Sequence, residues 1–426
     1  MPSNAVTVTA VFEPLPYVEI GTAAELYNIR DDLSGSYKLT NDISLSSYTN
    51  WLPIGTESNP FTGSLDGDGK KISGLKIDRP TEGYAGLFGY VYGGEIVNIA
   101  LENADIAGGG DAGAIVGIME GGVISGCLVS GTIVSSAFSP ELLSSSGGVA
   151  GSIWDGSVIS NCNSTADVIA ENDAGGIAGG VYDSTIINSS NSGYILASLN
   201  YSDSSAISGG IAGYVENGEI TGSFNAGKVE SVSNNSSSAS VAGGIAGGLT
   251  YDSLIADSYN AGDIDSYSEA DYPGSSVSGG IAGYVWDSTI TRSYSLGNIT
   301  SSSTSGGIAG SSEGYDSITD CAAINAAISA VDDAGRIVGY VYYPEYSEIT
   351  NNFALSGMTA IGLAVFDAGD IQRHGVGKTD AQLRQQSTYS GAVSGNGLGG
   401  LGWGFGFNDA SPWGIVSGEY PFLYWE

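Results

Sequence analysis

Positive charge is scarce in this sequence. Of the 426 residues only 12 are Lys or Arg, against 46 Asp or Glu, and the formal net charge at pH 7 is −34. A protein that binds nucleic acid needs a basic surface to neutralise phosphates, and an anionic membrane surface would repel so acidic a chain. We therefore expect no nucleic-acid partner and no attraction to anionic lipid.

Cysteines and long apolar runs are scarce as well. Three cysteines do not make a disulfide framework, and no run of about 18 apolar residues is present, so we expect no membrane insertion. The first residues, MPSNAVTVTAVF, lack the charged and apolar regions of a signal peptide. Charged residues make up only 14% of the chain, which disfavours long surface helices because their solvent-facing side is usually charged.

A glycine-rich string repeats along the chain. GGIAG occurs at 175–179, 209–213, 243–247, 279–283 and 306–310, with looser copies GLFG at 86–89, GAIVG at 113–117, GGVAG at 147–151 and GRIVG at 335–339. The last glycine of each copy, here called the marker glycine, lies at 89, 117, 151, 179, 213, 247, 283, 310 and 339. Successive marker glycines are 27 to 36 residues apart, which is typical of a repeat architecture.

Apolar residues keep fixed positions relative to the marker glycine. An aliphatic residue lies two positions before every marker glycine and two positions after eight of the nine. An Ile follows seven to ten positions after each marker: Ile96, Ile124, Ile159, Ile186, Ile220, Ile255, Ile290, Ile318 and Ile349. A third apolar position recurs as Ile133, Val168, Ile195, Val229, Ile264 and Ile299. The alternation predicts about three short strands in each unit.

One such unit cannot bury its apolar side chains alone, whereas stacked units bury them in continuous ladders. We therefore predict an all-β fold, a parallel β-helix (β-solenoid) of about nine units with irregular N-terminal turns. A propeller is disfavoured because its blades need about 40 residues. The insertions fall mainly between the third strand and the next GGIAG, where they form either a binding edge or tolerated Ser-rich loops.

Both ends of the repeat predict short capping helices, which would cover the strand edges of the solenoid. Thr22 and Glu25 have capping-box spacing ahead of a helix at about 23–30, and Thr379 and Gln382 repeat that spacing. The aromatic-rich tail that follows is expected to fold over the last turn. The predicted organisation is 1–17, the end of a preceding β module and linker; 18–82, an N-terminal cap and first turns; 83–365, the repeat solenoid; and 366–426, a C-terminal aromatic-rich cap. We interpret the chain as part of a larger protein.

The units resemble the GLUG motif, whose G-L-x-G core is matched by residues 86–89 as they stand. The lead-in AAELYNIRDDLSGSYKLTNDISL and the closing TDAQLRQQSTY are also similar to the segments that flank such repeats, and the resemblance extends over about 20–426. It implies a secreted or surface-anchored prokaryotic protein. GLUG-type repeats occur in adhesin-like proteins and in the non-catalytic parts of zinc metallopeptidases that cleave immunoglobulin A. The one His of this chain and the lack of HExxH do not match that peptidase activity.

Aromatic residues recur at one and three positions after the marker glycine. Because the residue between them is aliphatic and expected inside, these rings should line one outer face, where they could stack on sugar rings. Alternatively, inserted loops bury them. The candidate ligand-binding residues are Tyr90, Tyr92, Trp154, Tyr182, Tyr214, Tyr284, Trp286, Tyr340 and Tyr342.

Other residues have simpler interpretations. Cys127, Cys162 and Cys321 replace the small inward residues Ser189, Ser223, Ser258 and Ser293 of other units, so we expect buried thiols, with a Cys127–Cys162 disulfide conceivable. Asp66 and Asp68 could contribute Ca²⁺ ligands but are better explained as a turn. We predict no cofactor and no dedicated metal site, although diffuse Ca²⁺ binding is compatible with the net charge.

A polysaccharide-cleaving β-helix enzyme is a further possibility for this architecture. Such an enzyme needs two carboxylates about 5 to 9 Å apart beside a sugar cleft. Asp183, Asp252, Asp287 and Asp316 could stack on one face, but each follows an aromatic residue at a recurrent turn, which suits Asp as a turn former. We therefore expect no enzymatic activity.

The resemblance and the repeat together predict an extracellular or cell-surface module, a rigid rod that acts as a structural or adhesion element. A carbohydrate-binding module that uses the outward aromatic face is the alternative, and a polysaccharide-cleaving enzyme is the third choice. The expected partner is a glycan or protein on the surface of a host or neighbouring cell.

Overall fold

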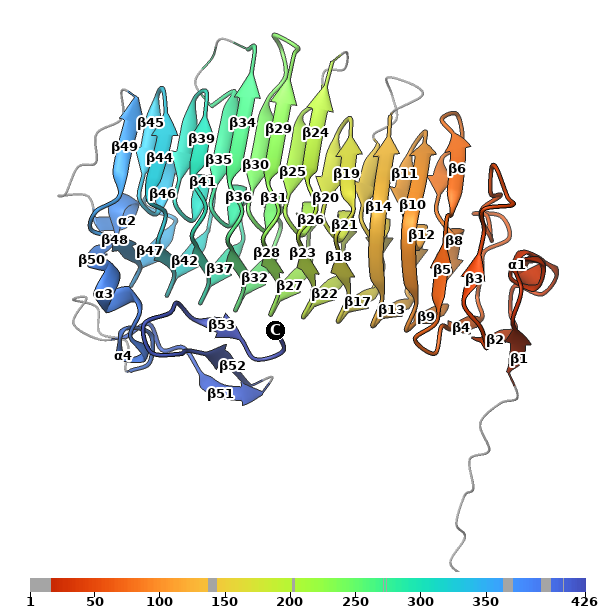
Figure 1. Ribbon diagram of the computed structural model, residues 1–426. Helices are drawn as coiled ribbons and strands as arrows, with labels where there is room; N and C mark the ends of the chain where they lie inside the picture. The colour runs from red at the N-terminus through yellow and green to blue at the C-terminus, as the bar shows by residue number, and fades with distance from the viewer. Residues whose placement is uncertain are drawn as a thin grey trace, which may run out of the picture.

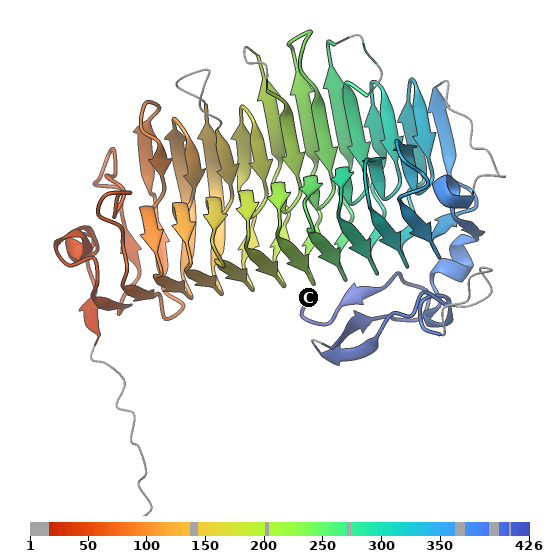
Figure 2. The ribbon, with the colours of Figure 1, turned by 180° about the vertical axis from the view of Figure 1, so that it is seen from behind.

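The chain forms the predicted parallel β-helix. The computed structural model describes residues 17–136, 144–200, 204–270, 272, 274–362, 371–391, 400–408 and 410–426. The turns stack side by side from the N-terminal end to the C-terminal end (Figures 1 and 2). The end of a preceding β module, predicted for 1–17, lies almost wholly outside these residues.

Four sheets run along the stack, and each regular turn adds a rung to every one of them. The isoleucine sheet contains β1 (Val18–Ile20), β2 (Ser36–Leu39), β4 (Ser64–Asp66), β9 (Glu95–Val97), β13 (Val123–Ser125), β17 (Val158–Ser160), β22 (Thr185–Ile187), β27 (Glu219–Thr221), β32 (Leu254–Ala256), β37 (Thr289–Thr291), β42 (Ser317–Thr319) and β47 (Glu348–Thr350).

The second sheet, the two-row sheet, carries two short strands in most turns. It contains β3 (Ile43–Ser44), β5 (Lys71–Ser73), β6 (Lys76–Arg79), β10 (Ala100–Gly108), β14 (Leu128–Ser135), β18 (Asn163–Ser164), β19 (Asp167–Ala170), β23 (Ser190–Asn191), β24 (Ile195–Leu199), β28 (Phe224–Asn225), β29 (Val229–Ser233), β33 (Tyr259–Asn260), β34 (Ile264–Ser268), β38 (Tyr294–Ser295), β39 (Ile299–Ser301), β43 (Ala322–Ala323), β44 (Ala327–Ala330), β48 (Phe353–Leu355), β49 (Thr359–Gly362) and β50 (Val376–Lys378).

The other two sheets meet at the glycine-rich string. The wall sheet contains β7 (Tyr84–Ala85), β11 (Asp111–Gly113), β15 (Ser145–Gly147), β20 (Asp173–Gly175), β25 (Ala206–Gly209), β30 (Ser240–Gly243), β35 (Ser276–Gly279), β40 (Thr304–Gly306) and β45 (Asp333–Gly335). The marker sheet contains β8 (Phe88–Tyr92), β12 (Val116–Glu120), β16 (Ala150–Trp154), β21 (Ala178–Tyr182), β26 (Ala212–Glu216), β31 (Ala246–Thr250), β36 (Ala282–Trp286), β41 (Ala309–Ser312) and β46 (Val338–Val341).

The aliphatic residues stack in register, as predicted. In the isoleucine sheet the parallel pairing joins each Ile to the Ile of the next turn, from Ile96 to Ile349, and all nine are buried. In the two-row sheet the ladder runs from Ile133 to Ile299. Burying each such side chain contributes about 1.5 to 3 kcal/mol, so these ladders are the main source of stability.

A turn holds more strands than the three predicted. The difference arises because the two-row sheet divides into two short strands and because a wall strand precedes each glycine-rich string. Wall strands such as β30 are rich in Ser, and the sequence alone does not separate them from the inserted loops. Side chains of the wall strands alternate between the core and the outer face, as the buried Ala242 and the outward Val241 of β30 illustrate.

The glycines of the string allow two strands to meet at a tight corner. A Cβ added to Gly209, the last residue of β25, would lie 1.8 Å from the carbonyl oxygen of Ala212. A Cβ on Gly210 would lie 2.2 Å from the carbonyl oxygen of Gly244 in the next turn. Because real Cβ atoms cannot approach backbone so closely, only glycine permits this corner and this stacking distance.

Small polar side chains form further ladders inside the stack. The backbone N–H of Cys162 donates to the Ser189 hydroxyl at 3.2 Å, and Ser189 donates to Ser223 in the same way. The three cysteines are buried and free, as expected of thiols that replace inward serines. A second ladder joins Asn191 to Asn225 and Asn225 to Asn260 through side-chain amides at 2.9 and 2.8 Å.

Short helices lie at both ends, as predicted. At the N-terminal end α1 (Ala23–Tyr27) continues into the 3₁₀ helix η1 (Asn28–Asp31), and the Thr22 hydroxyl accepts the backbone N–H of Glu25. At the C-terminal end lie α2 (Ile371–His374), α3 (Asp380–Leu383) and α4 (Gln386–Tyr389). Thr379 and Gln382 form the complete capping box that their spacing predicts.

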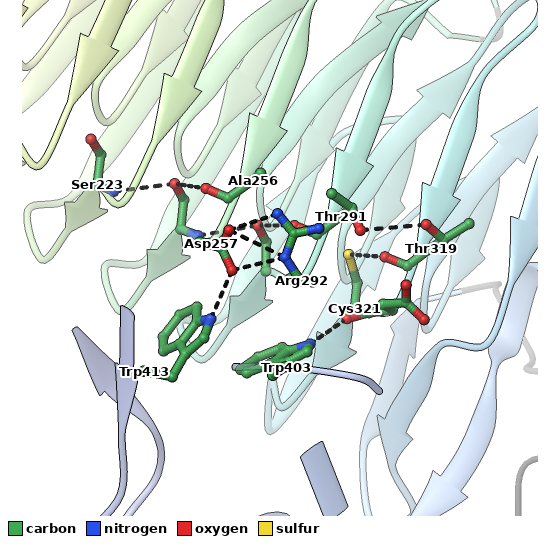
Figure 3. A network of polar contacts seen from close by, with 12 residues as sticks. Ser223, Ala256, Asp257, Thr291, Arg292, Thr319, Cys321, Trp403 and Trp413 are labelled. Carbon is green, nitrogen blue, oxygen red and sulfur yellow. Dashed lines mark hydrogen bonds and ion pairs between the residues drawn. The ribbon is translucent and has the colours of Figure 1, made fainter. Parts of the chain in front are cut away.

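The aromatic tail does not fold over the last turn, which corrects that expectation. It forms a small antiparallel sheet of β51 (Phe405–Asn408), β52 (Ser411–Gly414) and β53 (Phe422–Leu423) and lies along the side of the stack. Trp413 Nε1 donates to Asp257 at 3.0 Å, and Trp403 Nε1 donates to the carbonyl of Asp320 at 2.8 Å (Figure 3). The tail goes there because the two-row sheet presents an outward aromatic ladder, Phe224, Tyr259 and Tyr294, that it covers.

Candidate ligand-binding groove

The nine predicted aromatic residues lie in two outward rows on the marker sheet. The residue after each marker glycine belongs to the first row, in which the pairing joins Tyr214, Gly248, Tyr284, Ser311 and Tyr340 in successive turns. The residue three positions after the marker belongs to the second row, which includes Trp154, Tyr182, Thr250, Trp286 and Tyr342. The aliphatic residue between the rows points inward, as Val285 illustrates.

Four of the nine rings lie on the turns before Tyr214 and do not line one groove, although Tyr182 lies beside Tyr214 with ring centroids 6.1 Å apart. Tyr90 is buried, contacts the ring of Tyr84 and donates its hydroxyl to Glu120. Tyr92 is 58% exposed. Trp154 and Tyr182 stack on one another, with ring centroids 3.8 Å apart and an interplanar angle of 14°.

The other five rings converge on a groove of about 570 Å³: Tyr214, Tyr284, Trp286, Tyr340 and Tyr342. Outward side chains of the wall sheet form its second side, among them Ile207, Val241, Val277 and Thr304. Ser205, Ala239, Tyr272 and Gly274, which precede the wall strands or lie in the inserted loops, also line it. The inserted loops therefore lie at the rim and do not bury the rings: Trp286 and Tyr340 are each 38% exposed, and Tyr342 is 49% exposed.

Ring-bearing turns alternate with turns that carry small or polar side chains. Gly248 and Thr250 lie between the turn of Tyr214 and the turn of Tyr284. A Cβ on Gly248 would lie 2.8 Å from Cδ2 of Tyr214, so the Tyr214 ring leans over this glycine. The Thr250 hydroxyl donates to the Tyr214 hydroxyl at 2.9 Å and thereby holds that ring. Ser311 and Glu313 separate the turn of Tyr284 from the turn of Tyr340 in the same way.

Two carboxylates lie in the groove, and each has a partner. The Tyr284 hydroxyl donates to Glu313 at 3.4 Å, and burial raises the pKa of Glu313 above its ordinary value. Asp333 forms an ion pair with Arg373, in which Oδ1 of Asp333 lies 3.3 Å from Nη2 of Arg373. Glu313 and Asp333 thus give the groove hydrogen-bond acceptors beside aromatic faces.

A pair of carboxyl groups, Asp111 on β11 and Asp173 on β20, lies on the N-terminal half of the wall sheet. The Ser145 hydroxyl donates to Asp173 at 3.4 Å, and the Ser152 hydroxyl donates to Asp111 at 2.7 Å. Burial raises the pKa of both Asp111 and Asp173 to about 7, and the neighbouring Asp111 also raises that of Asp173. The stacked pair of Trp154 and Tyr182 belongs to the same outer face.

The aspartates considered for glycan cleavage do not converge. Asp183, Asp252 and Asp287 adopt positive φ values of 47°, 57° and 50°, a conformation that Asp tolerates in turns. Asp316 instead points inward, accepting the Ser312 hydroxyl at 2.6 Å and the backbone N–H of Ser288 at 3.1 Å. Burial raises the pKa of Asp316 to about 6.

The Asp66–Asp68 segment forms a turn with a cationic partner. Asp66 accepts the backbone N–H of Asp68 at 2.9 Å, and the ammonium of Lys38 lies 2.8 Å from Asp68. Asp68 has a φ of 50°. Among the described residues, no three side chains of His, Cys, Asp or Glu gather closely enough to hold a metal ion.

The sequence did not identify the second side of the groove. Ile207, Val241 and Val277 each lie six positions before a marker glycine. This recurrence is the feature of the sequence that points to the second side of the groove. It was hidden because those residues follow Ser-rich insertions of variable length. Glu313 occupies the same position relative to its marker glycine as Trp286 does, but an aromatic pattern alone does not single out a carboxylate.

Comparison with known proteins adds partial likenesses. No family model matches the chain. Halomucin of Haloquadratum walsbyi is 39% identical over 121 residues, which cover 25% of this chain and 1% of halomucin. A candidate Gly-rich membrane protein of Evansella cellulosilytica is 39% identical over 114 residues, which cover 25% of this chain and 13% of that protein. The matched regions thus span only a small part of either relative.

Comparison of structures finds two partial likenesses. A candidate immunoglobulin A1 protease from Bacteroides ovatus aligns over 96% of this chain and 93% of its own, with 18% identity and a TM-score of 0.39. A structure named IgA1 protease aligns over 70% of this chain and 21% of its own, with 18% identity and a TM-score of 0.43.

These names also correct one expectation. We expected no enzymatic activity, but both of the structures above are named as proteases. That expectation is contradicted and is not retained.

Within the described residues, the structure has no helix that is both long and apolar enough to span a bilayer.

Proposed function

We propose that the chain is a rigid, surface-displayed rod that serves in adhesion. The observation that supports this proposal best is the unbroken stack. The isoleucine sheet alone joins twelve strands, from β1 to β47, through parallel pairing, and glycine corners and polar ladders keep its turns in register. Such a stack holds a binding surface at a fixed distance and orientation from its point of attachment.

The named relatives support a surface location. Halomucin and the Gly-rich membrane protein both carry names that fit the cell envelope or its exterior. The net charge of −34 also favours a soluble, well-hydrated rod that does not associate with its own copies.

Surface display is tested by antibodies raised against the chain. We expect them to label intact cells of the source organism, and brief protease treatment of those cells should remove the label. Labelling that appears only after the cells are permeabilised would contradict the proposal.

Adhesion is tested by coupling the chain to microbeads. Beads that carry the folded chain should be retained on mucin-coated or cell-coated surfaces, whereas beads that carry heat-unfolded chain should not.

Carbohydrate binding in the groove is the second candidate function, and the converging rings favour it. Five aromatic residues predicted as ligand-binding line one groove, together with the hydrogen-bonding groups of Thr250 and Glu313. Aromatic faces and a few convergent polar groups are the usual composition of a small-molecule or sugar site.

A further inference from the structure

The groove has a two-turn periodicity. Tyr214 lies on β26, Tyr284 on β36 and Tyr340 on β46, so a ring recurs in every second turn of the first row. Strands stack about 4.8 Å apart, so these rungs are about 9.6 Å apart along the rod. Trp286 and Tyr342 add second-row rings to the turns of Tyr284 and Tyr340.

The turns between them carry small or polar side chains in place of rings. Gly248 contributes no side chain, and Thr250 contributes a hydroxyl, while Ser311 and Glu313 contribute a hydroxyl and a carboxylate. The groove therefore presents aromatic and polar rungs in strict alternation along the rod axis. An extended β-linked polysaccharide has the same pattern, because successive sugar rings are turned by about half a revolution and every second ring presents the same face.

The charge of the groove selects among polysaccharides. Its lining contains the carboxylates of Glu313 and Asp333 and no Lys, Arg or His among the described residues, and the whole chain carries −34. Uronic acids and sulfated sugars would meet like charge without a cation to pair them. Asp333 pairs with Arg373 through one carboxylate oxygen, and Glu313 accepts the Tyr284 hydroxyl at one oxygen. The second oxygen of each carboxylate can accept a hydrogen bond from a sugar hydroxyl.

We propose that the groove binds an extended, uncharged, β-linked polysaccharide that lies parallel to the rod axis. Alternate sugars stack on the aromatic rungs of Tyr214, Tyr284 with Trp286, and Tyr340 with Tyr342. The intervening sugars lie over the turns of Thr250 and Ser311, and we expect them to donate hydrogen bonds to the half-buried Glu313. This inference rests on the second candidate function and specifies its ligand class and direction.

The test is affinity electrophoresis of the full chain through native gels. The uncharged probes are hydroxyethylcellulose, galactomannan and xyloglucan, and the anionic probes are carboxymethylcellulose and polygalacturonate. We expect retardation by at least one uncharged probe and none by carboxymethylcellulose, which has the backbone of hydroxyethylcellulose. Tyr284→Ala and Trp286→Ala should each weaken retardation roughly fivefold, since one aromatic contact is worth about 1 kcal/mol.

The matched control is Tyr92→Ala, which removes an exposed ring from the second row outside the groove. It should leave retardation unchanged, and melting curves of all variants should show that they are folded. Stronger retardation by anionic than by uncharged probes, abolished by Trp286→Ala, would overturn the ligand class while leaving carbohydrate binding in the groove in place. Retardation that Tyr92→Ala weakens as much as Trp286→Ala does would overturn the location. No retardation by any probe would overturn both this inference and the carbohydrate candidate, but not the surface rod, which the antibody experiment tests.

Discussion

At the scale of single residues, the carboxyl groups of Asp111 and Asp173 make stability depend on pH. Burial raises the pKa of both to about 7 in the folded chain, whereas their ordinary value is 3.8. The folded state therefore holds protons more tightly than the unfolded state between these values, and the free energy of unfolding falls as pH rises through that window. Above about pH 7 the loss is complete.

Asp173→Asn should remove much of this dependence, because an amide has no charge to bury. Asp173 is only 5% exposed, and we expect the variant to gain up to about 4 kcal/mol at pH 8 and little at pH 4. Thermal melting from pH 4 to pH 8 measures this difference. Parallel curves for the two proteins across the whole range would show that Asp173 does not titrate as described.

The Asn ladder is a second test at this scale. Asn225 is fully buried, donates to Asn260 and accepts from Asn191. Asn225→Leu should destabilise the chain by about 2 to 4 kcal/mol, because several buried polar groups lose their partners. Asn225→Ser should cost less, since Ser295 occupies the same position of a later turn and its hydroxyl accepts the Asn325 amide at 2.9 Å. Urea unfolding at constant pH measures both variants, and equal losses would contradict the ladder as a source of stability.

At the scale of structural elements, the C-terminal tail acts as a lateral brace. Trp413 is fully buried, stacks on Trp403 with centroids 4.6 Å apart and donates to Asp257, which Arg292 also contacts (Figure 3). Tyr294 donates its hydroxyl to the carbonyl of Pro421 at 2.5 Å. The tail thus joins turns of the solenoid that are not adjacent to it in sequence.

Trp413→Ala should therefore destabilise the chain by roughly 3 to 5 kcal/mol, the usual cost of removing a large buried aromatic residue. Trp286→Ala is the matched control, since that indole is 38% exposed and its removal should change the free energy of unfolding by less than about 1 kcal/mol. Differential scanning calorimetry of the two variants gives the comparison. A Trp413→Ala protein as stable as the control would mean that the tail does not brace the stack.

At the scale of the whole molecule, the repeated Ile, the marker glycines and the inward cysteines were sufficient to predict the stacked fold and its register. Those residues repeat because each must contact its own counterpart in the next turn. The position of the tail was not predictable, because it depends on the outward ladder of Phe224, Tyr259 and Tyr294, which the sequence pattern did not single out. The aromatic side of the groove was predictable, because its rings lie at fixed positions after the marker glycine. The wall side was not, because Ile207, Val241 and Val277 follow loops of variable length that obscure their alignment between units.

The measurement that tests the glycan groove most directly is hydrogen–deuterium exchange of the full chain with and without a pentasaccharide that has the backbone of the uncharged probe that retards it. If the C-terminal turns carry the glycan groove, exchange should slow in β26, β31, β36, β41 and β46 and in the wall strands β30, β35 and β40. Exchange in β8, β12 and β16 should not change. Protection centred on Trp154 and Tyr182, or on the tail, would contradict the location. If exchange is unchanged throughout the chain at a ligand concentration that saturates binding, the groove is not the binding site.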